Sequence, residues 1–289
     1  MLQRVLAVID AGSDNTGTVN WVVERAHMKP IHLELSSTEV LQHHPAIVGG
    51  APIMHNASDV SQNELELTRA VRHIRKQIPA TQIVATLRRG PPLEEIIFAS
   101  HRADLIVVGA STEFSSTALP SGLTSRAHCP VVVIPARWQP TTVRGAPRPG
   151  TVIVAAYDDA QSRRAIEFAA AEADLRGSAL QMVQCWRLPP SGQFPAVSPN
   201  PSHTQFERDF HAKSLGTLVD EVQTRYPLLQ VSSSLQQGAA AGVLMRHSLG
   251  ARLLVISAYR GGLIPETLMG SVTRALIEMP CPLAVIPPP

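Results

Sequence analysis

The feature that most constrains this chain is an internal repeat. The run ADLIVVGAS at residues 103–111 returns as ARLLVISAY at residues 251–259. Three pairs of landmarks keep a constant separation of 148 residues: Gly90 and Gly238, Ala103 and Ala251, Gly122 and Gly270. A separation that holds over so many positions indicates that a whole folding unit was duplicated, so the sequence predicts two domains of similar structure.

The chain length and a connector between the copies agree with this prediction. The chain has 289 residues, which is enough for two domains of common size. The segment PARWQPTTVRGAPRPG, residues 135–150, is rich in proline and glycine and favours an extended connector. We expect a first domain over residues 1–136, a linker over residues 137–150 and a second domain over residues 151–289.

Short β-branched runs alternate with helical stretches in both copies. The expected strands are residues 5–9, 31–35, 83–87, 105–109 and 131–135 in the first copy and residues 152–156, 180–186, 231–237, 253–257 and 283–287 in the second. Apolar strands separated by helices are typical of a parallel sheet covered on both faces. We therefore expect an α/β fold with two tandem, doubly wound domains, each built on a five-stranded parallel sheet.

The charge balance excludes two classes of partner. The chain has 25 Lys and Arg residues and 23 Asp and Glu residues, which gives a formal net charge of +2. This balance provides no broad positive electrostatic field that would attract nucleic acid or an anionic membrane. Arg69, Arg72, Arg75 and Lys76 recur at helical spacing, which favours a solvated helix face over a nucleic-acid patch. Arg88 and Arg89, just before Gly90, are interpreted as loop charges, with a place at the border of the ligand cleft as the alternative.

Hydropathy predicts where the protein is found. No apolar run approaches the roughly 18 residues of a membrane span. The N-terminal stretch MLQRVLAVIDAGSD turns polar too early for a signal peptide. We expect a cytoplasmic protein with no membrane contact.

The cysteines and histidines do not form metal-binding patterns. Cys129, Cys185 and Cys281 are odd in number, far apart and beside apolar strands, which favours reduced, buried thiols. His43, His44 and His55 lie in a segment rich in glycine and proline with no further ligands, which favours a surface loop over a metal site.

The sequence also contains no recognisable catalytic set. It has no G-x-S-x-G nucleophile elbow and no G-x-x-x-x-G-K-[ST] phosphate loop. Glu94 and Glu95 are adjacent on an expected helix, where they point to different faces and make poor acid/base partners. We expect neither catalytic residues nor a metal site.

Three segments resemble the universal stress protein family in its tandem, two-domain form. They are RRGPPLEEIIFASHRADLIVVG (88–109), SRRAIEFAAAEADLRGSAL (162–180) and LMGSVTRALIEMPCPLAVIP (268–287). The resemblance covers essentially all of both halves. It implies an open five-stranded fold like that of the adenine-nucleotide alpha hydrolases, dimerisation often through the last strand and, in one branch of the family, adenine-nucleotide binding.

That branch carries a glycine-rich turn after strand four and an acid at the end of strand one. Glycines there let backbone N–H groups approach phosphates, which a Cβ atom would obstruct. The first copy keeps Asp10, Gly109 and Gly122, but Thr112 and Leu123 replace the second glycine and the Ser/Thr position. The first copy therefore keeps half of the site.

The second copy also keeps half of the site. Gly270 and Ser271 are retained, while Tyr157 takes the place of the strand-one acid and Asp158 follows it. Ser257 and Arg260 replace the first two glycines. Because the Arg260 guanidinium suits a phosphate and Gly261 can supply the turn one residue late, the second copy is the stronger candidate for an adenine nucleotide such as ATP.

The sequence alone leaves open whether these residues have structural roles instead. Gly122 and Gly270 fit the start of a helix after a loop, and Asp10 and Asp158 fit helix caps.

The patterns together predict a non-enzymatic stress-response regulator or scaffold with degenerate nucleotide sites. We expect its two domains to pack as an internal pseudo-dimer near the strands VVVIP and LAVIP, because an exposed edge strand needs a partner. Further homodimerisation and a protein partner stay open. So do two alternatives: a slow ATP-hydrolysing enzyme that relies on Asp10 and Asp158, and a ligand-free interaction module that uses long loops such as residues 187–203.

Overall fold

Strands and helices alternate along the chain. The computed structural model describes residues 2–11, 13–39, 62–110, 118–135, 138–139, 150–186, 201–258, 275–277 and 279–288. The elements of the first half are β1 (Gln3–Val8), α1 (Thr16–Met28), β2 (Ile31–Glu39), α2 (Gln62–Gln77), β3 (Gln82–Arg89), α3 (Pro92–Ser100), β4 (Leu105–Ala110), α4 (Ala118–Arg126) and β5 (Val131–Pro135). Those of the second half are β6 (Val152–Ala155), α5 (Ala160–Arg176), β7 (Leu180–Trp186), α6 (Pro201–Arg225), β8 (Val231–Gln237), α7 (Ala240–His247), β9 (Leu253–Ser257) and β10 (Leu283–Ile286).

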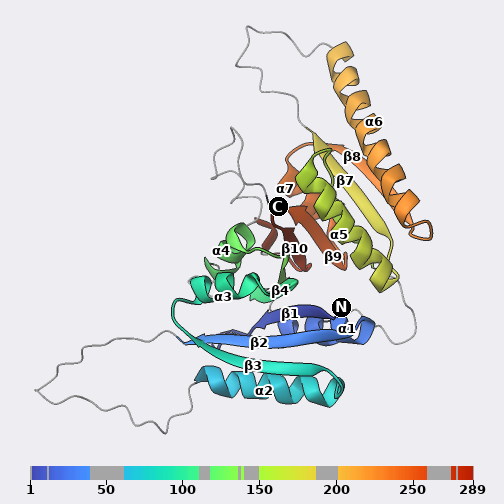
Figure 1. The fold of residues 1–289 in the computed structure, drawn as a ribbon. Helices are drawn as coiled ribbons and strands as arrows, with labels where there is room; N and C mark the ends of the chain where they lie inside the picture. The colour runs from blue at the N-terminus through green and yellow to red at the C-terminus, as the bar shows by residue number, and fades with distance from the viewer. Residues whose placement is uncertain are drawn as a thin grey trace, which may run out of the picture.

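The ten strands that the structure describes join one open sheet, in the order β3-β2-β1-β4-β5-β10-β9-β6-β7-β8 (Figure 1). Every pairing within a half is parallel. In each half the strand order reverses at the first strand: β2 and β3 lie on one side of β1 and β4 and β5 on the other, and β7 and β8 lie on one side of β6 and β9 and β10 on the other. This order is that of a doubly wound sheet. The α/β fold class expected from the sequence is confirmed.

The junction between the halves is centred on equivalent positions of the repeat. Strands β5 and β10 pair antiparallel, with Ala284 opposite Val132 and the pairs Leu283–Val133 and Val285–Val131 on either side. Val132 and Ala284 are 152 residues apart, the same separation as Cys129 and Cys281 in the repeat. The two halves therefore meet about a local two-fold axis that passes through this pair of strands.

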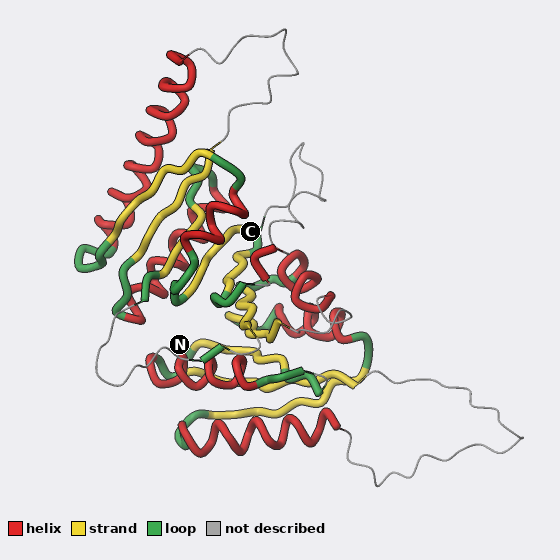
Figure 2. Tube along the Cα trace, turned by 180° about the vertical axis from the view of Figure 1, so that it is seen from behind, coloured by secondary structure: helices red, strands yellow, loops and turns green. Residues whose placement is uncertain are grey.

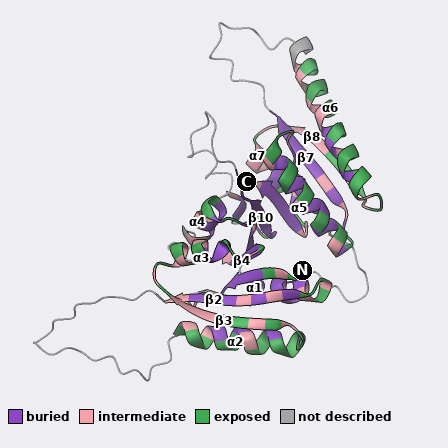
Figure 3. Cartoon of the chain, viewed as in Figure 1, coloured by how far each residue is buried: buried purple, intermediate pink, exposed green. Residues whose placement is uncertain are grey.

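Helices cover both faces of the sheet (Figure 2). Alternate side chains of each strand enter opposite layers: the layer containing Val5 and Ala7 also holds the buried residues of α1, α2, α5 and α6, whereas the layer containing Leu6 and Val8 holds those of α3, α4 and α7. Both layers take residues from both halves. The inner strands are accordingly buried, whereas β3 and β8 at the two ends of the sheet are only partly covered and the outer faces of α2 and α6 are exposed (Figure 3).

Local geometry follows the repeat. Gly90 and Gly238, both just after a strand, have φ values of 144° and 146°. Residues with a Cβ atom rarely adopt this backbone conformation. The expectation that Asp158 caps a helix is wrong, because α5 begins with Asp159, whose side chain accepts a hydrogen bond of 2.7 Å from the Ser162 backbone N.

Two more expectations bear on the surface. Arg88 and Arg89 lie at the end of β3 rather than in a loop. Arg88 donates to Glu34 at 2.6 Å and to Ser36 at 2.9 Å, because parallel pairing brings these side chains onto one face of the sheet. None of the described helices combines the length and the hydropathy that a membrane span needs.

Candidate functional site

A cavity of about 340 Å³ opens at the carboxyl ends of β1 and β4. The strand order reverses between these two strands, and in doubly wound sheets this is where ligands bind. Residues from both strands, from the end of β2 and from α3 and α4 line it: Val8, Ile9, Asp10, Ser13, Asn15, Thr38, Pro92, Leu93, Glu94, Val108, Gly109, Leu119 and Pro120. The structure thus brings two of the predicted residues, Asp10 and Gly109, into one cavity.

Asn15 shapes the turn that presents Asp10. Its side-chain Nδ2 donates to the backbone O of Asp10 at 2.7 Å and of Ser13 at 3.2 Å, and its Oδ1 accepts from Asp10 N at 3.1 Å. The Ser13 hydroxyl donates to Asp10 Oδ2 at 2.8 Å. Asp10 does not cap α1, because the N-cap residue of that helix is Asn15. The turn therefore holds the exposed Asp10 carboxylate at the cavity rim.

Two hydroxyl groups near the cavity lack a hydrogen-bond partner among the described residues. Thr38 Oγ1 is a buried atom on the cavity lining, and Thr18 Oγ1 is buried beneath Gly109. A Cβ on Gly109 would come within 3.2 Å of Thr18 Oγ1. A buried hydroxyl without a partner costs free energy that a bound polar ligand recovers, so Thr38 is suited to contact one.

Gly122 has a packing role. It lies inside α4, where a Cβ would come within 2.6 Å of the Leu93 side chain. Leu93 in turn lines the cavity. The interpretation of Gly122 as the start of a helix is wrong, because α4 begins at Ala118. Its missing side chain sets how closely α3 and α4 approach.

The charged residues of the lining are acidic. Asp10 and Glu94 contribute carboxylates, and no Lys or Arg is among the residues given above. Glu94 also forms an ion pair of 3.7 Å with Arg126, both well exposed. Glu95, its neighbour, packs beside Gly90 instead, as expected for adjacent helical residues. A phosphate in this cavity would need a divalent cation, which binds one or two carboxylates together with phosphate oxygens.

The described part of the second half differs at the equivalent place. Tyr157 follows β6, and its hydroxyl donates to the Cys185 backbone O at 3.1 Å, across the end of β7. Asp158 pairs with Arg163 at 2.7 Å. The predicted Arg260, Gly261, Gly270 and Ser271 lie outside the described residues, as do His43, His44, His55 and most of loop 187–203.

The three cysteines are buried thiols, as the sequence predicts. Burial raises the pKa of Cys129 and of Cys281 to about 12, with the Asp104 carboxylate adding to the shift at Cys129. Both thiols stay protonated at neutral pH, which makes them unreactive. Within the described ranges, no group of three or more His, Cys, Asp and Glu side chains is placed to hold a metal.

Sequence reasoning missed Ser13, Asn15 and Thr38. The polar run that follows β1 was a signal for the first two, because a polar cluster at the carboxyl end of a strand marks a ligand edge. Nothing in the sequence pointed to Thr38, which the pairing of β1 with β2 brings to the cavity.

Residues 150–287 match the model of the universal stress protein family. A universal stress protein of Mycobacterium bovis is 26% identical over 263 residues, covering 91% of this chain and 79% of the relative. One of Mycobacterium tuberculosis is 27% identical over 211 residues, covering 68% of each chain.

Two solved structures share the fold over the full length. A universal stress protein from Archaeoglobus fulgidus gives a TM-score of 0.66 at 15% identity and covers 98% of this chain and 96% of its own. A putative universal stress protein from Pseudomonas aeruginosa gives a TM-score of 0.64 at 16% identity, covering 99% and 94%.

Proposed function

Because the chain belongs to the universal stress protein family, we propose that it is a non-enzymatic stress-response regulator that binds an adenine nucleotide in its first half. Its site is the cavity at the ends of β1 and β4. The observation that carries the proposal is the meeting there of Asp10, Gly109 and the Thr38 hydroxyl, which has no hydrogen-bond partner among the described residues.

The size and shape of the cavity suit a nucleoside. A volume of about 340 Å³ falls within the range of small-molecule sites. Apolar walls from Val8, Ile9, Leu93 and Val108 suit a purine ring or the sugar face, and Thr38 offers a hydroxyl for a polar edge.

The acidic rim favours a nucleotide that carries a bound magnesium ion over a metal-free nucleotide. Asp10 and Glu94 repel a bare phosphate chain, while a magnesium ion carried by the nucleotide removes that repulsion. Asp10 is the carboxylate that would face this ion, since the turn clasped by Asn15 holds it at the rim. Nucleotide binding that requires magnesium is the consequence.

A binding role is favoured over turnover. Hydrolysis needs a base aligned with an attacking water and donors for the developing charge. The described residues of the lining contribute carboxylates and include no Lys or Arg to supply that charge. The nucleotide would then set a conformational state instead of being consumed.

Calorimetry with ATP, ADP and AMP tests the proposal, with and without magnesium. We expect binding in magnesium, a loss of about tenfold in affinity for Thr38→Val, which removes one hydrogen bond, and a larger loss for Asp10→Asn. Asp158→Asn is the matched control, because it removes a carboxylate at the corresponding edge of the second half. No heat from wild type, together with no nucleotide released on denaturation, would overturn the proposal.

The enzymatic alternative is separable in the same samples. Steady phosphate release from ATP that disappears in Asp10→Asn would establish turnover in the first half. If phosphate is released no faster than from heat-inactivated protein, the site binds ATP without hydrolysing it.

A further inference from the structure

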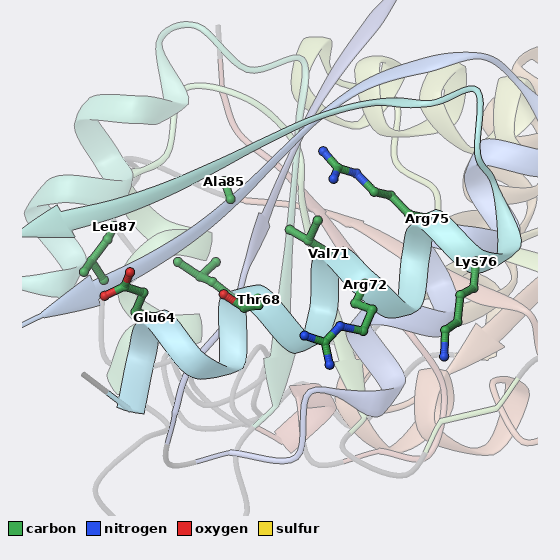
Figure 4. A pocket seen from close by; sticks show the side chains of 9 residues that line it. Glu64, Thr68, Val71, Arg72, Arg75, Lys76, Ala85 and Leu87 are labelled. Atoms are coloured by element: carbon green, nitrogen blue, oxygen red, sulfur yellow. The ribbon is translucent and has the colours of Figure 1, made fainter. Parts of the chain in front are cut away.

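A second and larger hollow of the first half lies between α2 and the edge strand β3. Its volume is about 740 Å³, and it is lined by Glu64, Leu67, Thr68, Val71, Arg72, Arg75, Lys76, Ala85 and Leu87. It shares no lining residue with the cavity at β1 and β4. We call it the α2–β3 groove (Figure 4).

The rim of this groove is basic. Arg72, Arg75 and Lys76 are exposed, and the described residues include no acid paired with them, in contrast to Arg69, which pairs with Glu66 at 2.6 Å. Figure 4 shows the Arg75 side chain extending over α2 toward β3, while Arg72 and Lys76 project from the outer side of the helix. Three cations thus gather at one end of the groove.

The fold itself does not require these cations. At the repeat separation of 148 residues, the buried face of α2 (Leu67, Ala70, Ile74) returns in α6 as buried Leu215, Leu218 and Val222. The three basic positions return as Asp220, Gln223 and Thr224. A solvated helix face is served equally by those residues, so the basic rim is particular to the first half.

The floor of the groove is apolar and ends at an open sheet edge. Val71, Ala85 and Leu87 are only partly covered, and among the strands that the structure describes β3 is the last on its side of the sheet. Gly90 N donates to Glu39 O of β2. The N–H and C=O groups of successive residues in a strand point to opposite sides. Because the Gly90 N–H points toward β2, the backbone groups of Leu87 and Ala85, at odd positions, point to the open edge.

From these features we propose that the α2–β3 groove binds an extended, acidic peptide segment of a partner protein. The segment adds as a strand along β3, with an apolar side chain on Val71 and Leu87 and carboxylates on Arg72, Arg75 and Lys76. Main-chain hydrogen bonds to an exposed edge supply affinity in such complexes, and alternate side chains supply specificity. Opposite charge on the two surfaces speeds their encounter.

A nucleic acid is the less suitable occupant. Single strands bind in basic grooves by stacking bases on aromatic side chains, and the described residues that line this groove include no aromatic side chain. Glu64, at the other end of the groove, also opposes a continuous phosphate chain. An apolar floor beside an open strand edge suits a peptide backbone.

Fluorescence anisotropy with a labelled peptide of Glu-Glu-Val-Val, repeated twice, tests the proposal on the full chain. The repeat places acidic and apolar side chains in turn on each face of an extended strand. We expect binding that weakens with salt and falls at least about tenfold in R72E/R75E, which loses two charge-assisted contacts. The double variant R102E/K213E changes the net charge equally at exposed sites elsewhere and should bind like wild type.

A backbone test separates strand addition from simple charge attraction. Ala85→Pro removes an N–H that faces the open edge, where proline is tolerated, and should weaken binding about tenfold as well. Ala85→Ser keeps that N–H and matches Ser233 of the second half, so it should bind as wild type does. The unfolding midpoint of each variant shows that it is folded.

Three results would overturn the proposal. One is unchanged peptide binding in both R72E/R75E and Ala85→Pro. The second is equal binding of a Glu-Gly peptide, which would show that the apolar floor contributes nothing. The third is tighter binding of a thymidine oligonucleotide that R72E/R75E also abolishes, which would assign the groove to nucleic acid.

Discussion

At the residue scale, Gly122 illustrates how a motif position can have two reasons to be glycine. The resemblance to nucleotide-binding relatives gives it a place near phosphates. In the structure, its hydrogen faces Leu93 of α3, which is itself part of the cavity wall. Close helix packing and cavity shape therefore depend on the same missing Cβ.

Gly122→Ala tests the packing role. The new methyl group meets a leucine side chain that can shift toward the cavity, so we expect the free energy of unfolding to fall by about 1 to 2 kcal/mol. Denaturant unfolding measures this change, and calorimetry should show weaker nucleotide binding as Leu93 moves into the cavity.

The matched control is Gly216→Ala on α6, where nothing lies within 4 Å of the position that the new methyl group would take. That change should stabilise the protein by about 0.5 to 1 kcal/mol, since alanine is the better helix former. If Gly122→Ala proves as stabilising as Gly216→Ala, the packing role is wrong.

At the element scale, α1 and α5 hold the halves together through buried charges. Arg25 of α1 contacts Glu172 of α5, and Arg176 of α5 contacts both Glu172 at 3.2 Å and Glu24 of α1 at 2.8 Å. Both arginines also lie over the Trp21 ring, at 5.9 and 5.4 Å from its centre. Charges this deeply buried are stable only while they remain paired.

Glu172→Gln should therefore destabilise the protein strongly. The change leaves Arg25 without its buried carboxylate partner and leaves Arg176 with only one of its two carboxylate partners. Breaking a buried ion pair typically costs about 3 to 5 kcal/mol. Chemical denaturation measures the loss.

Glu221→Gln serves as the control for that measurement. Glu221 contacts Arg163 on the exposed face of α6, and exposed pairs contribute about 1 kcal/mol or less. Equal losses in the two variants would show that the α1–α5 network contributes no more than a surface pair.

At the scale of the whole molecule, the duplicated chain has the architecture of a two-fold dimer whose buried charges between the halves are asymmetric. Arg25 and Glu172 are 147 residues apart, the same separation as Val5 and Val152 at the start of each copy. They occupy equivalent positions and meet across the axis. A symmetric dimer of either half would bury two arginines or two glutamates against each other.

Separate expression of residues 1–145 and 146–289 tests this arrangement. Each half alone exposes the edge of β5 or β10 and a buried charge without its opposite. We expect an equimolar mixture to form a one-to-one complex in preference to either homodimer, because unpaired like charges at an interface cost several kcal/mol. Analytical ultracentrifugation or native mass spectrometry measures the species present.

Arg25→Glu in the first half provides the matching charge test. It should weaken the mixed complex, since it sets two carboxylates face to face. Homodimers of the unmodified halves that persist in the equimolar mixture would contradict the arrangement.

The sequence by itself determined the repeat, the fold class and the strands. The bounds of β5, β7, β8 and β9 match the expected runs, because alternating apolar runs and turn residues are local signals. It also placed Asp10 and Gly109 at one sheet edge, since parallel strands bring their carboxyl ends together.

Only the tertiary structure decided the remaining features. Thr38 reaches the cavity through the pairing of β1 with β2, Leu93 explains Gly122 through helix packing, and Arg25 finds Glu172 across the axis. Arg72 and Arg75 acquire a groove because β3 ends the sheet beside α2. Each of these depends on contacts between residues distant in the chain, which a pattern of neighbouring residues does not encode.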